Sequence, residues 1–278
     1  MQSGKLNSTL KVIEHVSDLE PGRYRAFVPT MGALHDGHLS LIKIAQQFDA
    51  QTLVSIFVNP LQFDNPDDLA KYPKQLEQDF AKLDSLGVGA VFVPNSNEIY
   101  PSKPELIDSG AIGLMYEGKS RAGHFDGVLT VVNRLFNLVN PKFAIFGEKD
   151  FQQLFLIKQL VKQRQIPTEV ISAPLVRDID GLALSSRNVR LSPDGRKAAL
   201  VISKALRAGS ETGDLEKMQE IIASEPQFKL DYLSIIDENN FSIANDRTVN
   251  ARILIAGWVE GVRLIDNMPV QNWTYLEK

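Results

Sequence analysis

Short apolar segments alternate with longer amphipathic ones along the first two thirds of the chain. The short segments are rich in β-branched and aromatic residues, which is typical of strands buried on both faces of a parallel sheet. The predicted strands are 25–30, 52–58, 90–94, 143–147 and 168–174, and helical spacing occurs over 39–48, 74–86, 129–139 and 150–163. This alternation predicts an α/β fold with a doubly wound, Rossmann-like parallel sheet, which binds ligands at the carboxyl ends of its strands.

The pattern changes after about residue 176, where two helical stretches precede three extended apolar segments. The helical stretches are 193–208 and 214–224, and the extended segments are 228–237, 251–259 and 261–267. This order predicts a smaller C-terminal α+β domain with an antiparallel sheet. We therefore expect two domains, residues 1–176 and 177–278, of which the second is a candidate lid.

Two predicted loops of the first domain are long. They span 59–73 and roughly 95–127, and the second is expected to contain an extra strand or two. Long loops in a compact domain tend to be functional or mobile.

Composition narrows the class of protein. The 278 residues are 44% hydrophobic, which is enough to bury a full core. A net charge of −4 provides no overall basic field for nucleic acid. The chain has no cysteine, which excludes disulfides and thiolate chemistry, and no apolar run approaches the ~18 residues that a membrane span needs. We expect a cytoplasmic protein that binds neither nucleic acid nor membrane.

Two of the four histidines lie three residues apart where the first predicted strand passes into a helix. In PTMGALHDGHLSLI, residues 29–42, His35 and His38 surround Gly37. The first turn of a helix offers unpaired N–H groups to an anion, and imidazoles can donate to phosphate or protonate a leaving group. A capping or surface role is the structural alternative. A zinc site would need a further ligand, and the chain has neither cysteine nor an H-E-x-x-H motif.

Polar side chains also follow other predicted strands. In VNPLQF, residues 58–63, Asn59 and Gln62 should face the same crevice, where an amide suits a hydroxylated acid; Gln62 could also merely close the turn. A weaker cluster comprises Arg121, His124 and Arg134, which either lines an acid-binding pocket or orders its loop.

Two later stretches carry charge and hydroxyl groups. In GEKDFQQL, residues 147–154, Lys149 could place a cation against phosphates, Asp150 could cap the helix or accept from ribose, and Gln153 lies one turn further on. A solvated charge cluster is the alternative. The stretch VRDIDGLALSSRN supplies Ser185, Ser186 and Arg187 near the expected domain junction. Two hydroxyls and a guanidinium can stabilise the negative charge that moves onto departing pyrophosphate. The structural alternative is an ordinary surface loop.

Taken together, these stretches resemble one known family. H-x-G-H after the first strand with a late, serine-rich basic loop is the pattern of the nucleotidylyl transferase superfamily. PTMGALHDGHLSLI, SIFVNPLQF, GHFDGVLTVV, GEKDFQQL and DGLALSSRN, in this order, resemble the pantothenate synthetases, or pantoate–β-alanine ligases, from about residue 25 to IDN at 265–267. The resemblance implies an ATP-dependent condensation of pantoate with β-alanine through pantoyl adenylate, with release of pyrophosphate and AMP, a Mg²⁺ requirement and a homodimer.

The resemblance also implies roles for individual residues. His38 would be the proton donor, His35 its phosphate-binding neighbour, and Lys149 and Arg187 would carry positive charge. The ATP contacts would fall on Met31, Gly32, Ala33, Leu34, His35, Asp36, Gly37, His38, Gly147, Glu148, Lys149, Asp150, Val176, Leu184, Ser185, Ser186 and Arg187. Pantoate would contact Gln62 and Gln153, beside Asn59, and Asp79 matches an acidic position associated with magnesium. The family often has an arginine–threonine pair where this chain has Lys74 and Gln75.

Three other functions fit parts of the pattern. A nucleotidyltransferase with a phosphorylated acceptor would need extra lysine or arginine, but Gln62 and Gln153 are neutral. A tRNA synthetase would need an anticodon-binding domain or a basic stripe, and neither is evident. A non-catalytic nucleotide-binding protein would bind ATP without releasing pyrophosphate.

Overall fold

The computed structural model describes residues 10–49, 51–64 and 66–273. The outer ends of the two predicted domains lie outside these residues. The chain divides into two compact units. Residues 1–148 and 152–174 form the first unit, and residues 149–151 and 175–278 form the second. The short segment 149–151 therefore clusters with the C-terminal part of the chain, although the sequence places it inside the α/β pattern.

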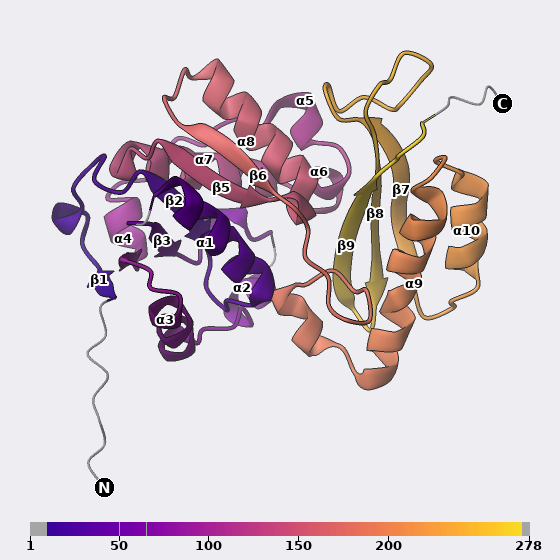
Figure 1. Ribbon diagram of the computed structural model, residues 1–278, viewed down its shortest axis with the longest axis horizontal. Coiled ribbons are helices and arrows are strands. Elements are labelled where there is room, and N and C mark those ends of the chain that lie inside the picture. The colour runs from indigo at the N-terminus through magenta and orange to yellow at the C-terminus, as the bar shows by residue number, and fades with distance from the viewer. Residues whose placement is uncertain (1–9, 50, 65, 274–278) are drawn as a thin grey trace, which may run out of the picture. The chain divides into compact units, whose positions relative to one another are not determined.

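The first unit contains a parallel sheet of six strands in the order β1-β4-β3-β2-β5-β6 (Figure 1). The strands are β1 (Lys11–Ile13), β2 (Ala26–Thr30), β3 (Leu53–Ile56), β4 (Ala90–Phe92), β5 (Phe143–Gly147) and β6 (Glu169–Ala173). The strands after β2 are added first on one side of it and then, from β5, on the other. The strand order therefore reverses between β2 and β5, and such a switch point is where doubly wound sheets bind ligands. The predicted fold class is confirmed.

Amphipathic helices cover the sheet. The longer helices of this unit are α1 (Asp36–Phe48), α3 (Leu76–Ser85), α7 (His124–Val139) and α8 (Phe151–Gln163). Helix α1 packs on β2 and β5, so its Ile42 shares a buried cluster with Val28 of β2 and Ile145 of β5. Phe136 of α7 meets Phe146 of β5 with ring centroids 6.3 Å apart. Burial of these apolar side chains supplies the main favourable free energy of the unit.

The loop at 95–127 contains helical turns, and the predicted extra strands are wrong. Its elements are α4 (Ser96–Ile99), α5 (Gly110–Gly113) and α6 (Glu117–Ser120). Side chains of α7 take the backbone groups that a strand partner would otherwise take. Thr130 Oγ1 accepts from the backbone N–H of Ile107 at 2.9 Å, and Asp126 accepts from that of Ser109 at 2.9 Å. The remaining short elements are η1 (Val16–Asp18), η2 (Pro60–Gln62), α2 (Pro66–Ala70), η3 (Glu148–Asp150) and η4 (Ser186–Arg190).

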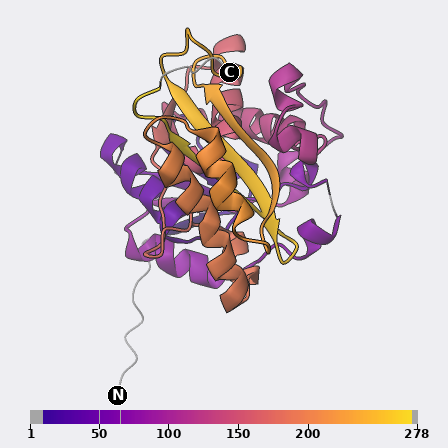
Figure 2. The same cartoon turned by 90° about the vertical axis from the view of Figure 1, so that its right-hand side faces the viewer.

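The second unit is built on an antiparallel sheet of β7 (Lys229–Asp237), β8 (Ala251–Val259) and β9 (Val262–Pro269). Helices α9 (Pro193–Gly209) and α10 (Leu215–Ala223) lie side by side over one face of this sheet (Figure 2). Ile253 and Ile255 of β8 join the core beneath these helices. Because side chains alternate along a strand, Arg252 and Leu254 lie on the other face. The predicted α+β architecture is confirmed.

Candidate active site

The histidine pair lies at the carboxyl end of β2, where the chain turns into α1. Gly32 and Ala33 both have left-handed backbone conformations, with φ of +80° and +51°. A Cβ on Gly32 would come within 3.0 Å of Ile56 Cγ2 and 3.1 Å of Asp79 Oδ2, so only glycine fits the conformation and the space. The turn thus brings the strand end close to β3 and α3.

Asp79 of α3 holds this turn. Its Oδ2 accepts from the backbone N–H of Ala33 at 2.9 Å, and its Oδ1 accepts from that of Leu34 at 2.8 Å. Successive backbone N–H groups of this kind form a concavity that binds an anion, and here the anion is the protein's own carboxylate. Lys82, one turn along α3, donates to the carbonyl of Leu34. The carboxylate is only 1% exposed. These contacts give Asp79 a structural role in shaping the loop before the histidines.

His35 and His38 cap the first turn of α1 reciprocally. Nδ1 of His35 accepts from the backbone N–H of Gly37 at 3.2 Å, and Nδ1 of His38 accepts from that of His35 at 3.3 Å. The ring centroids are 4.1 Å apart. A nitrogen that accepts a hydrogen bond carries no proton, so the neutral form of each ring is protonated at Nε2. Both rings therefore use Nδ1 for the backbone and keep a proton donor at Nε2.

The capping by His35 and His38 agrees with both interpretations of these histidines, as helix caps and as phosphate ligands. A capping role and a phosphate-binding role are compatible, because the cap uses one nitrogen of each imidazole and fixes the orientation of the other. Asp36 and Gly37 complete the first turn, and the positive end of the α1 dipole lies there.

Asn59 and Gln62 follow β3 in η2 and form a closed hydrogen-bond network. Nδ2 of Asn59 donates to Gln62 Oε1 at 3.1 Å and to the carbonyl of Gly127 at 3.0 Å. Its Oδ1 accepts from the hydroxyl of Tyr100 at 3.0 Å and from the backbone N–H of Leu61 at 3.3 Å. These partners fix the orientation of the Asn59 amide, since a carbonyl only accepts and a backbone N–H only donates.

The orientation of Asn59 determines that of Gln62. Because Oε1 of Gln62 faces the Asn59 donor, its Nε2 points the other way and lies 3.1 Å from Sδ of Met31. Gln62 is 8% exposed and Asn59 is 1% exposed. The structure thus brings Gln62 together with Met31 of the predicted ATP loop. Asn59 is buried, and its contacts serve to orient Gln62, so direct binding of a substrate by Asn59 stays a prediction.

The weaker cluster predicted in the sequence is divided. His124 donates from Nδ1 to the backbone carbonyl of Gln62 at 2.8 Å, and Arg121 lies 3.0 Å from His124 Nε2. These two residues therefore order the peptide of Gln62. Arg134 instead donates to the carbonyl of Ile99 at 3.0 Å, away from that pair. This supports the loop-ordering interpretation of the cluster.

Neighbouring glutamines of α8 differ in their environments. Gln152 is buried: its Nε2 donates to the carbonyls of Ile112 and Met115, at 2.8 and 2.9 Å, and its Oε1 accepts from the N–H of Glu117 at 3.1 Å. Gln153 is half-buried. Sequence reasoning missed Gln152, because QQ at 152–153 does not say which amide faces inward.

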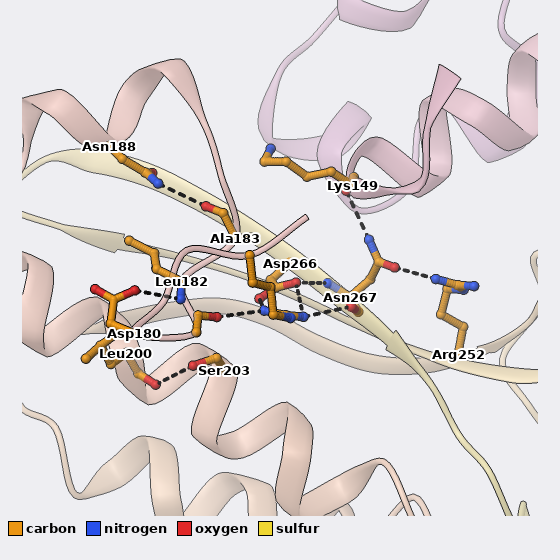
Figure 3. A network of polar contacts seen from close by, with 12 residues as sticks. Lys149, Asp180, Leu182, Ala183, Asn188, Leu200, Ser203, Arg252, Asp266 and Asn267 are labelled. Carbon is orange, nitrogen blue, oxygen red and sulfur yellow. Dashed lines mark hydrogen bonds and ion pairs between the residues drawn. The ribbon is translucent and has the colours of Figure 1, made fainter. Parts of the chain in front are cut away.

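Of the other predicted ATP residues, Gly147 and Glu148 belong to the first unit, and those from Lys149 onward belong to the second. Lys149 Nζ lies 3.8 Å from Asp150 Oδ2. The backbone N–H of Leu184 donates to the carbonyl of Val176 at 3.0 Å, which closes a short hairpin before the serine loop. Ser185 caps η4 by accepting from the N–H of Arg187 at 3.3 Å. Ser186 and Arg187 are half-buried. Figure 3 shows Asn188 bonded to the carbonyl of Ala183 at 2.9 Å, which ties the end of this loop to its beginning.

The described residues do not form a protein cage for magnesium. No group of three or more histidine, aspartate or glutamate side chains among them is arranged to hold a metal ion. Both oxygens of Asp79 already accept backbone hydrogen bonds, and this carboxylate is buried. The backbone contacts account for the Asp79 carboxylate without a metal ion, and its role as a magnesium ligand stays a prediction.

Comparison with known proteins identifies the family. A model of the pantoate-beta-alanine ligase family matches residues 5–269. The chain belongs to this family. A pantothenate synthetase of Acidothermus cellulolyticus is 44% identical over 258 residues, which cover 88% of this chain and 85% of that protein. Membership makes the chain an enzyme of the ligase class.

Solved structures of pantothenate synthetases share this fold. A pantothenate synthetase from Thermus thermophilus superimposes on this chain with a TM-score of 0.88 at 40% identity. The match covers 94% of this chain and 100% of the Thermus chain. A pantoate-beta-alanine ligase from Francisella tularensis, complexed with beta-gamma ATP and beta-alanine, has a TM-score of 0.77 at 40% identity. The match covers 93% of this chain and 97% of the Francisella chain. Within the described residues, no helix is both long and apolar enough to cross a bilayer.

Proposed function

We propose that this enzyme joins pantoate to β-alanine in two steps at one site. In the first step a carboxylate oxygen of pantoate attacks the α-phosphorus of ATP, the bond to the β-phosphate breaks, and pyrophosphate leaves. In the second step the amine of β-alanine attacks the acyl carbon of pantoyl adenylate, the acyl–oxygen bond breaks, and AMP leaves as the amine loses a proton. Atoms balance without any further reactant.

The observation that carries this proposal is the paired capping of α1 by His35 and His38. Both Nδ1 atoms accept backbone hydrogen bonds, so the two Nε2–H groups are donors at the positive end of a helix and at the edge of the sheet where the strand order reverses. Such donors stabilise negative charge that moves onto the phosphates during adenylation. A pantoate carboxylate is already ionised at neutral pH, so this step requires alignment and charge neutralisation more than a strong base.

The remaining residues take the roles expected in the family. Lys149 and Arg187 neutralise phosphate charge, the hydroxyls of Ser185 and Ser186 donate to phosphate oxygens, and the backbone of Val176 contacts adenine. Gln62 presents Nε2–H, a hydrogen-bond donor, to pantoate, and Gln153 binds the same substrate. The other members of the ATP set are Gly147, Glu148, Asp150 and Leu184. Since the described side chains do not form a magnesium cage, Mg²⁺ would arrive bound to the phosphates of ATP, which is usual for this ion.

The test is pyrophosphate release from ATP and Mg²⁺ in the presence of pantoate, with and without β-alanine. We expect release to depend on pantoate, and mass spectrometry to detect pantothenate and AMP only after β-alanine is added. His38→Ala and Lys149→Ala should slow adenylate formation in a single turnover by orders of magnitude while folding is retained. ATP binding without pantoate-dependent pyrophosphate would contradict the proposal and favour a non-catalytic nucleotide-binding protein.

Two further properties are part of the proposal by family resemblance. We expect a homodimer, which sedimentation of the purified chain tests directly, and a cytoplasmic location, which fits a chain without cysteine.

A further inference from the structure

The tripeptide IDN, residues 265–267, has no role in the function proposed so far. It lies on β9, and its last residue pairs with Leu254 of β8. Asn267 is 4% exposed. A polar amide in the middle of a strand is uncommon, and when it is buried its hydrogen bonds must be made within the protein. Its partners therefore show what it does.

Asn267 binds the main chain of Lys149. Its Nδ2 donates to the carbonyl of Lys149 at 3.0 Å, and its Oδ1 accepts from Nη1 of Arg252 at 2.6 Å (Figure 3). A guanidinium can only donate, so Arg252 fixes which end of the amide is the oxygen. The donor end must then face Lys149. All three residues belong to the second unit.

Arg252 also holds the residue two positions after Lys149. Its guanidinium carbon lies 4.1 Å from the ring centroid of Phe151, and the Phe151 ring stacks on Phe241 at 6.3 Å. Nε of Arg252 donates to Glu238 at 2.6 Å, which provides a charge partner for this buried cation. The segment 149–151 is thus fixed at its first residue by a hydrogen bond and at its last by two ring contacts.

Asp266 ties the hairpin at 176–184, which leads to Ser185, to the same strand. Its carboxylate forms a two-pronged pair with Arg177, with N···O distances of 2.6 and 2.9 Å, and it accepts from the N–H of Asn267 at 2.7 Å. Arg177 also donates to the carbonyl of Gly181 at 3.1 Å. Two adjacent residues of β9 therefore hold the two segments from which the proposed phosphate ligands emerge. Bidentate pairing of this kind fixes orientation as well as distance.

We propose that Asn267, oriented by Arg252, is a positioning residue for Lys149. It binds the peptide of Lys149, which sets the point from which the ammonium group reaches the phosphates. The proposal rests on the proposed function, because it assumes that Lys149 neutralises phosphate charge. A side chain that approaches the transition state from a shifted backbone loses stabilisation steeply, so the effect should fall on kcat for adenylation and leave pantoate binding unaltered.

Asn267→Asp is the variant that tests the hydrogen bond to Lys149 most directly. Aspartate has the same size and still accepts from Arg252, but it cannot donate to the Lys149 carbonyl and places negative charge against it. Asn240→Asp is the matched control: it adds the same charge to an exposed loop of the same unit, where Oδ1 only accepts from the N–H of Ser242. Both variants should be compared with Lys149→Ala and with the Asn267→Asp/Lys149→Ala double variant.

We expect Asn267→Asp to lower kcat for pantoate-dependent pyrophosphate release by about tenfold or more, the scale of a lost buried hydrogen bond, with the KM for pantoate within about twofold. Asn240→Asp should match the parent enzyme. In the Lys149→Ala background, Asn267→Asp should have no further effect. Full activity of a folded Asn267→Asp, or an equal loss with and without Lys149, would overturn the inference.

Two additional readouts keep the outcomes separate. If Lys149→Ala itself leaves pyrophosphate release unchanged, the proposed role of Lys149 fails, whatever Asn267 does. Circular dichroism checks folding, and Asn267→Ala replaces the aspartate variant if that one does not fold. Arg252→Lys keeps the positive charge but loses the fork that orients the amide, so it should lower kcat in the same direction, and unchanged kcat would contradict the role of Arg252.

Discussion

Asn59 donates a hydrogen bond from Nδ2 to Oε1 of Gln62 over 3.1 Å. This contact decides which end of the Gln62 amide faces Asn59 and which end faces Met31. The carbonyl of Gly127 and the backbone N–H of Leu61 fix the orientation of Asn59, and the hydroxyl of Tyr100 adds a further hydrogen bond by donating to Asn59 Oδ1 at 3.0 Å. If Gln62 binds pantoate, as the proposed function has it, Tyr100 supports that contact through Asn59 without touching the substrate.

Tyr100→Phe should raise the KM for pantoate. The change removes one hydroxyl and leaves the ring, so Asn59 loses one of the hydrogen bonds that hold its side chain in place. The cost of one hydrogen bond is about 1 kcal/mol, which corresponds to roughly a fivefold rise in KM, and the KM for ATP should be unaltered. Steady-state kinetics with each substrate in turn measure both constants. Tyr24→Phe, at a buried tyrosine of the first unit, is the control and should change neither.

Asn59→Asp should have a larger effect in the same direction. Aspartate keeps the shape but cannot donate to Gln62, so the Gln62 amide would turn and present its oxygen to the pantoate carboxylate. We expect the KM for pantoate to rise by about 10- to 100-fold, from the cost of roughly 1–3 kcal/mol for a mismatched buried polar group. If Tyr100→Phe or Asn59→Asp still raises this constant in a Gln62→Ala background, the effect does not pass through Gln62.

Asp79→Asn should destabilise the first unit without changing the requirement for magnesium. An amide can accept only one of the two N–H groups that the carboxylate binds, and it turns an NH₂ toward the other. The cost is about 1–3 kcal/mol, or several degrees of Tm at about 2–4 °C per kcal/mol. Differential scanning calorimetry measures this fall. A large rise in the magnesium concentration for half-maximal activity, with Tm unchanged, would instead favour a metal-binding Asp79.

Strands β2 to β5 of the α/β unit were predictable because they are buried on both faces. Ala26–Thr30 and Phe143–Gly147 are apolar runs, which predict buried strands from the local sequence alone. The histidine pair follows the first of these strands, so its place at the end of a strand was also predictable. Strand β1 was missed: KVI is three residues long, and its Val12 is 44% exposed. The loop at 95–127 was wrongly expected to contain strands, because side chains of α7 that satisfy its backbone lie more than fifteen residues further along the chain.

The supporting residues of the candidate site could not be predicted for the same physical reason. Asp79 acts on Ala33 across 46 residues, and Tyr100 acts on Asn59 across 41. Neither partner follows from periodicity or capping rules, which describe neighbours within one or two turns. Residue types with strong local signals, such as glycine in the turn and histidine at a helix start, were identified, whereas the groups that orient them come from distant elements.

The pair His15 and Glu98 predicts a pH dependence of stability. Nδ1 of His15 lies 3.0 Å from Glu98 Oε1, and this hydrogen bond raises the pKa of His15. The backbone N–H of Val16 and the imidazole lower the pKa of Glu98. A raised histidine pKa contributes stability below the unfolded value of about 6.5, and a lowered glutamate pKa contributes above about 4.3. Both contributions are fully present together only between these values; the first is lost as the pH rises through the raised pKa of His15, and the second as it falls through the lowered pKa of Glu98.

Glu98→Gln should therefore lower Tm most near pH 5.5 and much less at pH 8, where His15 is neutral. Thermal unfolding of the parent and the variant at both pH values measures the difference. In NMR titrations the imidazole of His15 should return toward its ordinary pKa in the variant. A Tm difference that is the same at both pH values would show that the pair contributes no charge interaction.

Adjacent glutamines of α8 provide the last test, since one should affect stability and the other substrate binding. Gln152→Ala removes the partner of two carbonyls and one N–H group in the loop of α5 and α6, which should lower Tm by several degrees at a cost of about 2–4 kcal/mol. Gln153→Ala truncates a half-buried side chain one position along, so Tm should change by less than about 1 °C. Pantoate binding should weaken in Gln153→Ala, measured by calorimetric titration in the presence of a non-hydrolysable ATP analogue, while ATP binding is retained. Equal losses of affinity for both ligands would exclude Gln153 as a pantoate ligand, because a side chain that contacts one substrate cannot weaken both equally unless it acts through the fold.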